Sequence, residues 1–177
     1  MFQSDMKTPH AEARQMKRIP RPPKLLSLDF DGVLHPSTDI LDFATSGLGP
    51  VAYAQSRPRL FRWAPLLAEA LRGTDCEILV HSSWRNTVSD SDLRDFLAPS
   101  GLVRRVVGSA PRHRAREDAI LEVLALMGVE QEEIVVLDDA VKEFSTLRPQ
   151  LIACNPLLGI SDPATCLALR SRLESGV

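Results

Sequence analysis

Two pairs of aspartates follow short apolar segments of this 177-residue sequence. Asp29 and Asp31 come after LLSL, and Asp138 and Asp139 close the segment IVVLDD. Four carboxylates gathered in one small site would repel one another, so such a site needs bound protons or a cation. Mg²⁺ prefers oxygen ligands and commonly binds through a few carboxylates together with substrate phosphate. The sequence therefore predicts a magnesium site with Asp29, Asp31, Asp138 and Asp139 as its candidate ligands.

The first pair also has the residue types that a covalent phosphoester hydrolysis needs. Such a reaction uses a nucleophile in line with the leaving oxygen and an acid that protonates this oxygen. Asp29 and Asp31 can divide these tasks, because a turn at Gly32 can direct the second carboxylate away from the cation. One carboxylate is then bound to the cation, and the other is free to carry a proton.

Donors for the phosphate oxygens are expected between the two acidic pairs. Ser82 ends the apolar segment EILVHS and supplies a hydroxyl. Arg116 opens a predicted helix, whose first amides also attract phosphate, and Arg114 is its close alternative. Ser83 and Arg85 follow Ser82 on a predicted turn, where they could bind phosphate, or instead bond to the backbone and pair with a nearby acid.

Further side chains near these positions have two interpretations each. Trp84 is favoured as a packing residue over a surface on which a base stacks. His81 is expected in the core or on a sheet face, whereas His35 follows the first acidic pair and could meet the leaving group. The basic residues within 112–116 could form a patch for a polyanion or an ordinary solvated loop.

Apolar segments and amphipathic segments alternate along the chain, with residues 35–57 expected as a loop. Strands are predicted at 25–30, 77–82, 103–108, 134–138 and 150–154. Helices are predicted after residue 60, near 89–97, over 116–127 before Gly128, and over 162–174. This order predicts the α/β class, with a Rossmann-like parallel sheet of about five strands and helices on both faces. Ligands of such sheets bind beyond the carboxyl ends of the strands, where both acidic pairs are expected.

The overall composition fits one soluble domain at residues 24–177. Apolar residues make up 44% and the formal net charge is −2, so any site for a polyanion must be local. Residues 1–23 are basic and contain prolines but no apolar core segment, so we expect a flexible arm and neither a secretory signal nor a membrane span. Three widely spaced cysteines fit a reducing compartment, and we expect a cytoplasmic protein.

The segments LDFDGV, ILVHSS, a basic residue before AIL, and VVLDD occur in the order of the four motifs of the haloacid dehalogenase superfamily. The chain resembles this superfamily from residue 25 to about residue 175. The resemblance implies a magnesium-dependent phosphatase that forms an aspartyl phosphate. The implied roles are nucleophile for Asp29, general acid and base for Asp31, phosphate ligand for Ser82, and magnesium site for Asp138 and Asp139. The backbone carbonyl of Asp31 would be a further ligand.

The third motif and the cap region differ from the usual family pattern. The family usually has lysine where this chain offers arginine, and the distance to Gly128 favours Arg116 over Arg114. The segments SSWR, LDD and NPLLGI are similar to a bacterial subgroup of these domains that is attached to RNA-repair enzymes. Family members usually select substrates through an inserted cap, but residues 35–57 leave room only for a short flap.

A site without a large cap suits a bulky phosphorylated substrate, such as a nucleic acid end or a phosphoprotein. Two alternatives stay open. One is a small-metabolite phosphatase whose lid comes from a partner subunit, and the other is a phosphate or nucleic-acid binding module that has lost turnover. The sequence does not predict the oligomeric state.

Overall fold

The computed structural model describes residues 23–175, so the predicted arm lies outside the described residues except for Pro23. Its strands are β1 (Leu25–Leu28), β2 (Glu77–Val80), β3 (Val106–Ser109), β4 (Ile134–Asp138) and β5 (Leu151–Ala153). All neighbouring strands pair in parallel, in the order β3-β2-β1-β4-β5. The predicted parallel sheet is confirmed, and the two strands that precede the acidic pairs lie side by side at its centre.

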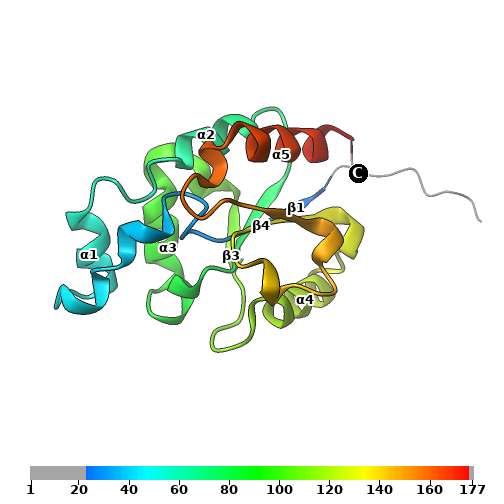
Figure 1. The fold of residues 1–177 in the computed structure, drawn as a ribbon. Coiled ribbons are helices and arrows are strands. Elements are labelled where there is room, and N and C mark those ends of the chain that lie inside the picture. Colours follow the sequence, from blue (N-terminus) through cyan, green and yellow to red (C-terminus); the bar gives the residue numbers. More distant parts are fainter. Residues whose placement is uncertain (1–22, 176–177) are drawn as a thin grey trace, which may run out of the picture.

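Helices cover both faces of this sheet (Figure 1). They are α1 (Pro50–Ser56), α2 (Ala64–Ala70), α3 (Asp90–Leu97), α4 (Arg116–Met127) and α5 (Pro163–Ser175). In Figure 1, α2 and α5 lie over one face and α4 lies over the other. Successive strand residues point to opposite faces, so Leu26 and Leu28 join the core on the α2 side while Leu25 joins the core on the α4 side. Strands buried on both faces explain the continuous apolar segments in the sequence.

The two helices with clear boundary residues in the sequence form where they were predicted. In α3, Ser89 caps the first turn by accepting a hydrogen bond from the backbone of Asp92, whose side chain accepts from the Ser89 amide in return. In α4, Gly128 follows the last turn with a φ of 64°, a conformation that glycine adopts without strain. The helix that carries Arg116 therefore begins and ends as the sequence indicates.

The strand predicted at 103–108 is shifted towards its end. Leu102–Arg105 form a 3₁₀ turn, and β3 begins only at Val106. The reason is Arg105, whose guanidinium donates to three backbone carbonyls in the segment before β2. This contact holds the chain in a turn although its sequence is compatible with a strand.

The loop expected over residues 35–57 contains short helical elements. Two 3₁₀ turns, Ser37–Ile40 and Phe43–Thr45, precede α1. Helix α1 starts with Pro50 and buries only Tyr53, so the sequence offers no apolar period that would reveal it. The prediction of a loop without helices was therefore wrong for this segment.

A segment after β5 braces the loop after β1. Ile160 donates its backbone N–H to the Val33 carbonyl at 3.0 Å, and Ser37 donates to the Pro156 carbonyl at 2.9 Å. Gly159 has a φ of 49°, and a Cβ at this position would collide with the Val33 carbonyl. Only glycine allows this close approach, which holds the chain beyond Asp31 in place.

No helix among the described residues is long and apolar enough to cross a membrane. Cys76 and Cys154 are buried with free thiols and pack as small apolar residues, and Cys166 is half-buried.

Candidate active site

The acidic pairs meet at the carboxyl ends of β1 and β4. These strands are neighbours, with Leu28 opposite Leu137, and the Asp29 amide donates to the Leu137 carbonyl at 3.1 Å. Asp29 and Asp138 are fully buried, and Asp139 is half-buried. One carboxylate oxygen from each of these three residues lies within 4.8 Å of the other two. The parallel register thus gathers three of the four predicted carboxylates.

Burial and mutual repulsion shape the charge of this group. Burial and the charge of Asp138 raise the pKa of Asp29, against the opposing effect of Arg116. Burial and the charges of Asp29 and Asp138 also raise the pKa of Asp139 to about 6. Burial acts in the same direction on Asp138, but a hydrogen bond from His81 and the charge of Arg116 lower its pKa overall. The group favours a proton or further positive charge.

The donor set fits a hard divalent cation. Its atoms are carboxylate oxygens, and a cation held by Asp29, Asp138 and Asp139 would relieve the repulsion that raises two of their pKa values. The carboxylate of Asp31 is not part of this group among the described residues, because it faces His35 and Trp84 instead. As predicted for the turn at Gly32, the side chain of Asp31 points away from the other carboxylates, so only its backbone carbonyl is left as the candidate ligand.

Arg116 and not Arg114 reaches the acidic group. One Arg116 nitrogen donates to Asp29 and, at 2.6 Å, to Asp138, and its Nε lies 3.3 Å from Glu143. Arg114 lies in the loop before α4, is exposed, and pairs with Glu122 of α4 at 3.1 Å. The geometry therefore favours Arg116 as the basic residue of the third motif.

Ser82 follows β2, the neighbour of β1, and its side chain is fully buried. Its hydroxyl is one of two buried side-chain polar atoms of the described residues that have no hydrogen-bond partner, the other being Gln150 Oε1. An unsatisfied buried hydroxyl costs free energy unless a ligand completes it. A phosphate oxygen would do so, whereas the predicted phosphate ligand Ser83 is exposed and has no comparable demand.

Arg85 was predicted to bind phosphate, but its contacts favour a structural role. The side chain is 2% exposed, and its guanidinium donates to the carbonyls of His81, Ser82, Pro111 and Arg114. Burial and the nearby Arg116 lower its pKa. Arg85 thus ties the turn that contains Ser82 to the loop that leads to Arg116.

His81 is a residue whose link to the site sequence reasoning missed. It is buried, as expected, but its Nε2 lies 2.7 Å from Asp138 Oδ2 and its Nδ1 lies 2.7 Å from the hydroxyl of Ser27. A tautomer with the proton on Nε2 donates to the carboxylate and accepts from Ser27. The signal in the sequence was that Ser27 and His81 are polar residues in or next to apolar strands, where each needs a buried partner.

Gly32 allows Asp139 to approach the loop after β1. Its φ is 70°, and a Cβ at this position would collide with the Asp139 carboxylate. We expect Gly32→Ala to destabilise the fold by about 1–2 kcal/mol through backbone strain and, in addition, to weaken Mg²⁺ binding by displacing Asp139. Urea unfolding and calorimetric titration with Mg²⁺ measure the two effects.

Gly101 provides the matched control for that change. Its φ is 77°, and a Cβ there would meet no atom within 4 Å. Gly101→Ala should therefore carry a similar strain and leave Mg²⁺ affinity unchanged. Equal affinity losses in both variants would contradict the contact between Gly32 and Asp139.

Glu117 fixes the loop that follows β4 and Asp139. Its carboxylate accepts from the amides of Ser145 and Leu147 at 2.9 and 2.7 Å, and from the Ser145 hydroxyl at 2.8 Å. Burial acts to raise the pKa of Glu117, but these hydrogen bonds outweigh it and lower the pKa. The second residue of α4 therefore anchors one side of the site, next to Arg116.

We expect Glu117→Gln to cost about 2 kcal/mol near neutral pH, because hydrogen bonds to a charged group are lost. Since the pKa is lowered in the folded state, the contribution is complete above the usual value of 4.5 and is lost as pH falls through the folded-state value. Urea unfolding at pH 7 and pH 3 should show the difference between wild type and variant shrinking. Glu122→Gln, at the surface pair with Arg114, should change stability by under about 0.5 kcal/mol.

The order of these groups on the sheet defines a class of protein. Aspartates follow β1, a serine follows β2, a basic residue opens the helix before β4, and an acidic pair ends β4, which together with the parallel sheet is the haloacid dehalogenase fold without a large cap. The family model described as "HAD domain in Swiss Army Knife RNA repair proteins" matches residues 25–165. The chain belongs to this family, which confirms the resemblance found in the sequence. No curated protein and no solved structure matches it significantly.

Proposed function

We propose that this protein is a magnesium-dependent phosphomonoesterase that acts through an aspartyl phosphate on Asp29. The observation that carries the proposal is that a group of carboxylates and a buried hydroxyl without a hydrogen-bond partner lie at the same edge of the sheet. Three carboxylates within 4.8 Å call for a cation, and the buried Ser82 hydroxyl calls for an acceptor or donor. A phosphate group with its Mg²⁺ satisfies both demands.

The roles follow from the positions of the side chains. Asp29 attacks phosphorus, while the Ser82 hydroxyl and the guanidinium of Arg116 stabilise charge on the non-bridging oxygens. Asp31 gives a proton to the departing oxygen and then takes one from the water that hydrolyses the aspartyl phosphate. Mg²⁺, held by Asp29, Asp138 and Asp139, would neutralise charge between carboxylate and phosphate.

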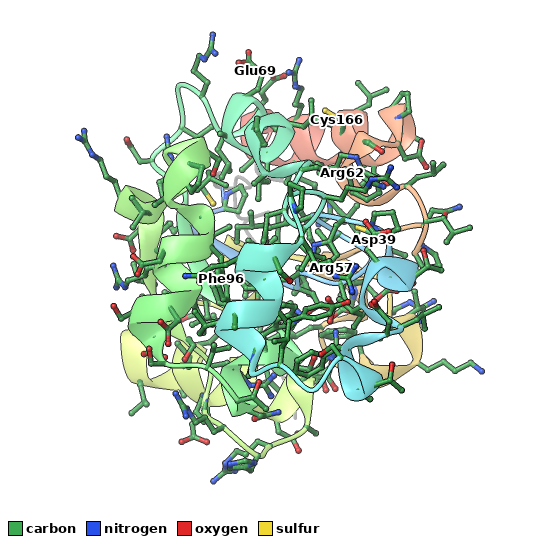
Figure 2. All side chains as sticks on the ribbon, turned by 90° about the vertical axis from the view of Figure 1, so that its left-hand side faces the viewer. Asp39, Arg57, Arg62, Glu69, Phe96 and Cys166 are labelled. Atoms are coloured by element: carbon green, nitrogen blue, oxygen red, sulfur yellow. The ribbon has the colours of Figure 1, made fainter. Side chains whose placement is uncertain are left out.

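The proposed substrate is a bulky phosphorylated end, and a nucleic acid end is favoured by the description of the family. The segment at residues 37–56, built of two 3₁₀ turns and α1, forms a short flap rather than a cap domain. Tyr53 donates to the Asp39 carbonyl at 3.0 Å and to the Asp42 carboxylate, which also pairs with Arg57. Figure 2 looks onto this flap, with α1 at the front and Asp39 and Arg57 near it.

The test is phosphate release from a generic aryl phosphate with Mg²⁺ and with a chelator in place of Mg²⁺. We expect turnover that depends on Mg²⁺ and returns when Mg²⁺ is added back. Oligonucleotides with 3′ or 5′ phosphates, phosphopeptides and sugar phosphates then separate the substrate classes by kcat/KM. Release that is unaffected by chelation would contradict the proposal, and oligonucleotide binding without any release would support the non-catalytic alternative.

A further inference from the structure

Asp31 is held by two nitrogen donors that lie outside the carboxylate group of the site. Trp84 Nε1 lies 3.0 Å from Oδ1 and 3.1 Å from Oδ2 of Asp31, and His35 Nε2 lies 3.0 Å from Oδ1. Oδ1 therefore has two partners, and Oδ2 shares only the Trp84 N–H. The Asp31 side chain is 13% exposed, while that of His35 is fully buried.

The direction of the His35 hydrogen bond follows from its other ring nitrogen. The backbone N–H of Phe61 donates to His35 Nδ1 at 3.3 Å, so Nδ1 carries no proton. The ring proton then lies on Nε2, which makes His35 a donor to Asp31. The Phe61 N–H can only donate, so it fixes Nδ1 of His35 as an acceptor and Nε2 as a donor.

Phe61 links the two donors. Its φ is 58°, a conformation that is rare for a bulky residue, and this turn aims its N–H at His35. Its ring packs edge-on against His35 at 5.2 Å and Trp84 at 5.7 Å, and stacks on Phe96 at 5.1 Å. Strained backbone persists where surrounding packing determines it, and it commonly supports a functional arrangement.

We propose that His35 and Trp84 are positioning residues that fix the carboxylate of Asp31 for proton transfer. This inference rests on the proposed phosphatase function. The two donors keep Asp31 rotated away from Asp29, Asp138 and Asp139, where it would otherwise join the cation. Oδ1 is occupied on two sides, so Oδ2 is the oxygen that gives its proton to the leaving group and later takes one from water. Proton transfer depends steeply on such orientation.

The leaving group provides a readout that a merely structural role would not move. Nitrophenolate departs without a proton, whereas an alkoxide needs one, so loss of a positioned acid slows the second kind of substrate more than the first. Trp84→Phe keeps an aromatic ring and removes the N–H donor. His35→Leu removes the donor, and His35→Gln keeps an N–H near the position of Nε2. We expect Trp84→Phe and His35→Leu to lower kcat/KM for an alkyl phosphate roughly 10–100-fold. The factor by which they lower kcat/KM for nitrophenyl phosphate should be severalfold smaller. His35→Gln should lie between His35→Leu and wild type.

Phe96→Leu is the matched control, because Phe96 belongs to the same aromatic cluster and makes no hydrogen bond to Asp31. It should change kcat/KM for both substrates by the same factor. Thermal unfolding of each variant checks the fold, and Trp84→Phe alone carries the test if His35→Leu does not fold. Equal losses on both substrates in Trp84→Phe, or a selective loss in Phe96→Leu, would overturn the positioning role. The proposed function would be overturned as well if wild type released phosphate from neither substrate, or if Asp29→Asn released it from both as fast as wild type.

Discussion

Asp29→Asn should lower phosphate release by at least about 10³-fold while the protein stays folded. An amide cannot act as the nucleophile. The substitution also removes the charge of one of the three carboxylates that lie within 4.8 Å of one another. Because burial and Asp138 raise the pKa of Asp29, removing its charge should not destabilise the protein without metal. Initial rates with a nitrophenyl phosphate, together with thermal unfolding, measure both effects.

The matched control for this prediction is Asp95→Asn. Asp95 is an exposed aspartate on α3, so the same chemical change occurs outside the carboxylate group. Its rate and its unfolding temperature should equal those of wild type. Adding Mg²⁺ should raise the unfolding temperature of Asp95→Asn as in wild type and raise that of Asp29→Asn less. Unchanged turnover in Asp29→Asn would refute Asp29 as the nucleophile.

The second large effect is expected at Arg116. Arg116→Ala should reduce kcat/KM roughly 10²-fold, because removal of a group that stabilises transition-state charge commonly costs this much. The loss also leaves the buried carboxylates of Asp29 and Asp138 without the guanidinium that now contacts both. Arg116→Lys keeps a positive charge on a long side chain and should retain most of the activity.

Arg114→Ala distinguishes this expectation from a general effect of positive charge in the loop. Arg114 is exposed and pairs only with Glu122 among the described residues, so its removal should leave kcat/KM within about twofold of wild type. Inhibition by inorganic phosphate adds a direct readout, since Arg116→Ala should raise the inhibition constant and Arg114→Ala should not. Equal losses in the two variants would show that phosphate is attracted by the loop as a whole.

The sequence was sufficient for the parallel sheet and for the boundaries of α3 and α4, because their signals were local. The apolar segments before Asp29 and Asp138 form strands that are buried on both faces of the sheet. A parallel sheet brings the carboxyl ends of these strands to one edge. Gly128 and Ser89 likewise mark helix ends through backbone chemistry that depends on a few neighbours. For the same reason, the meeting of Asp29, Asp138 and Asp139 could be inferred before their coordinates were known.

The positioning contacts of the site could not be predicted in the same way. Arg85 looked like a phosphate ligand by its place after Ser82, but its donors are directed to carbonyls that lie 26 and 29 residues further along the chain. Trp84 was correctly favoured as a packing residue, yet its N–H also reaches Asp31, 53 residues away. The link from His81 to Asp138 spans 57 residues. Such contacts depend on the directions of side chains in the folded core, and the spacing of residues within one segment does not predict these directions.

The brace between Gly159 and Val33 has a consequence for the order in which the protein becomes active. Asp29 is made early during synthesis, whereas the residues that complete its surroundings, Asp138, Asp139 and the segment ending at Ile160, are made late. A growing chain that stops before residue 160 carries the proposed nucleophile on a loop whose support is missing. Contacts of such long sequence separation also slow folding, because the entropy of closing a long loop is lost before they form. A nascent or truncated chain therefore has an incomplete site, and the proposed turnover requires that nearly the whole domain has emerged and folded.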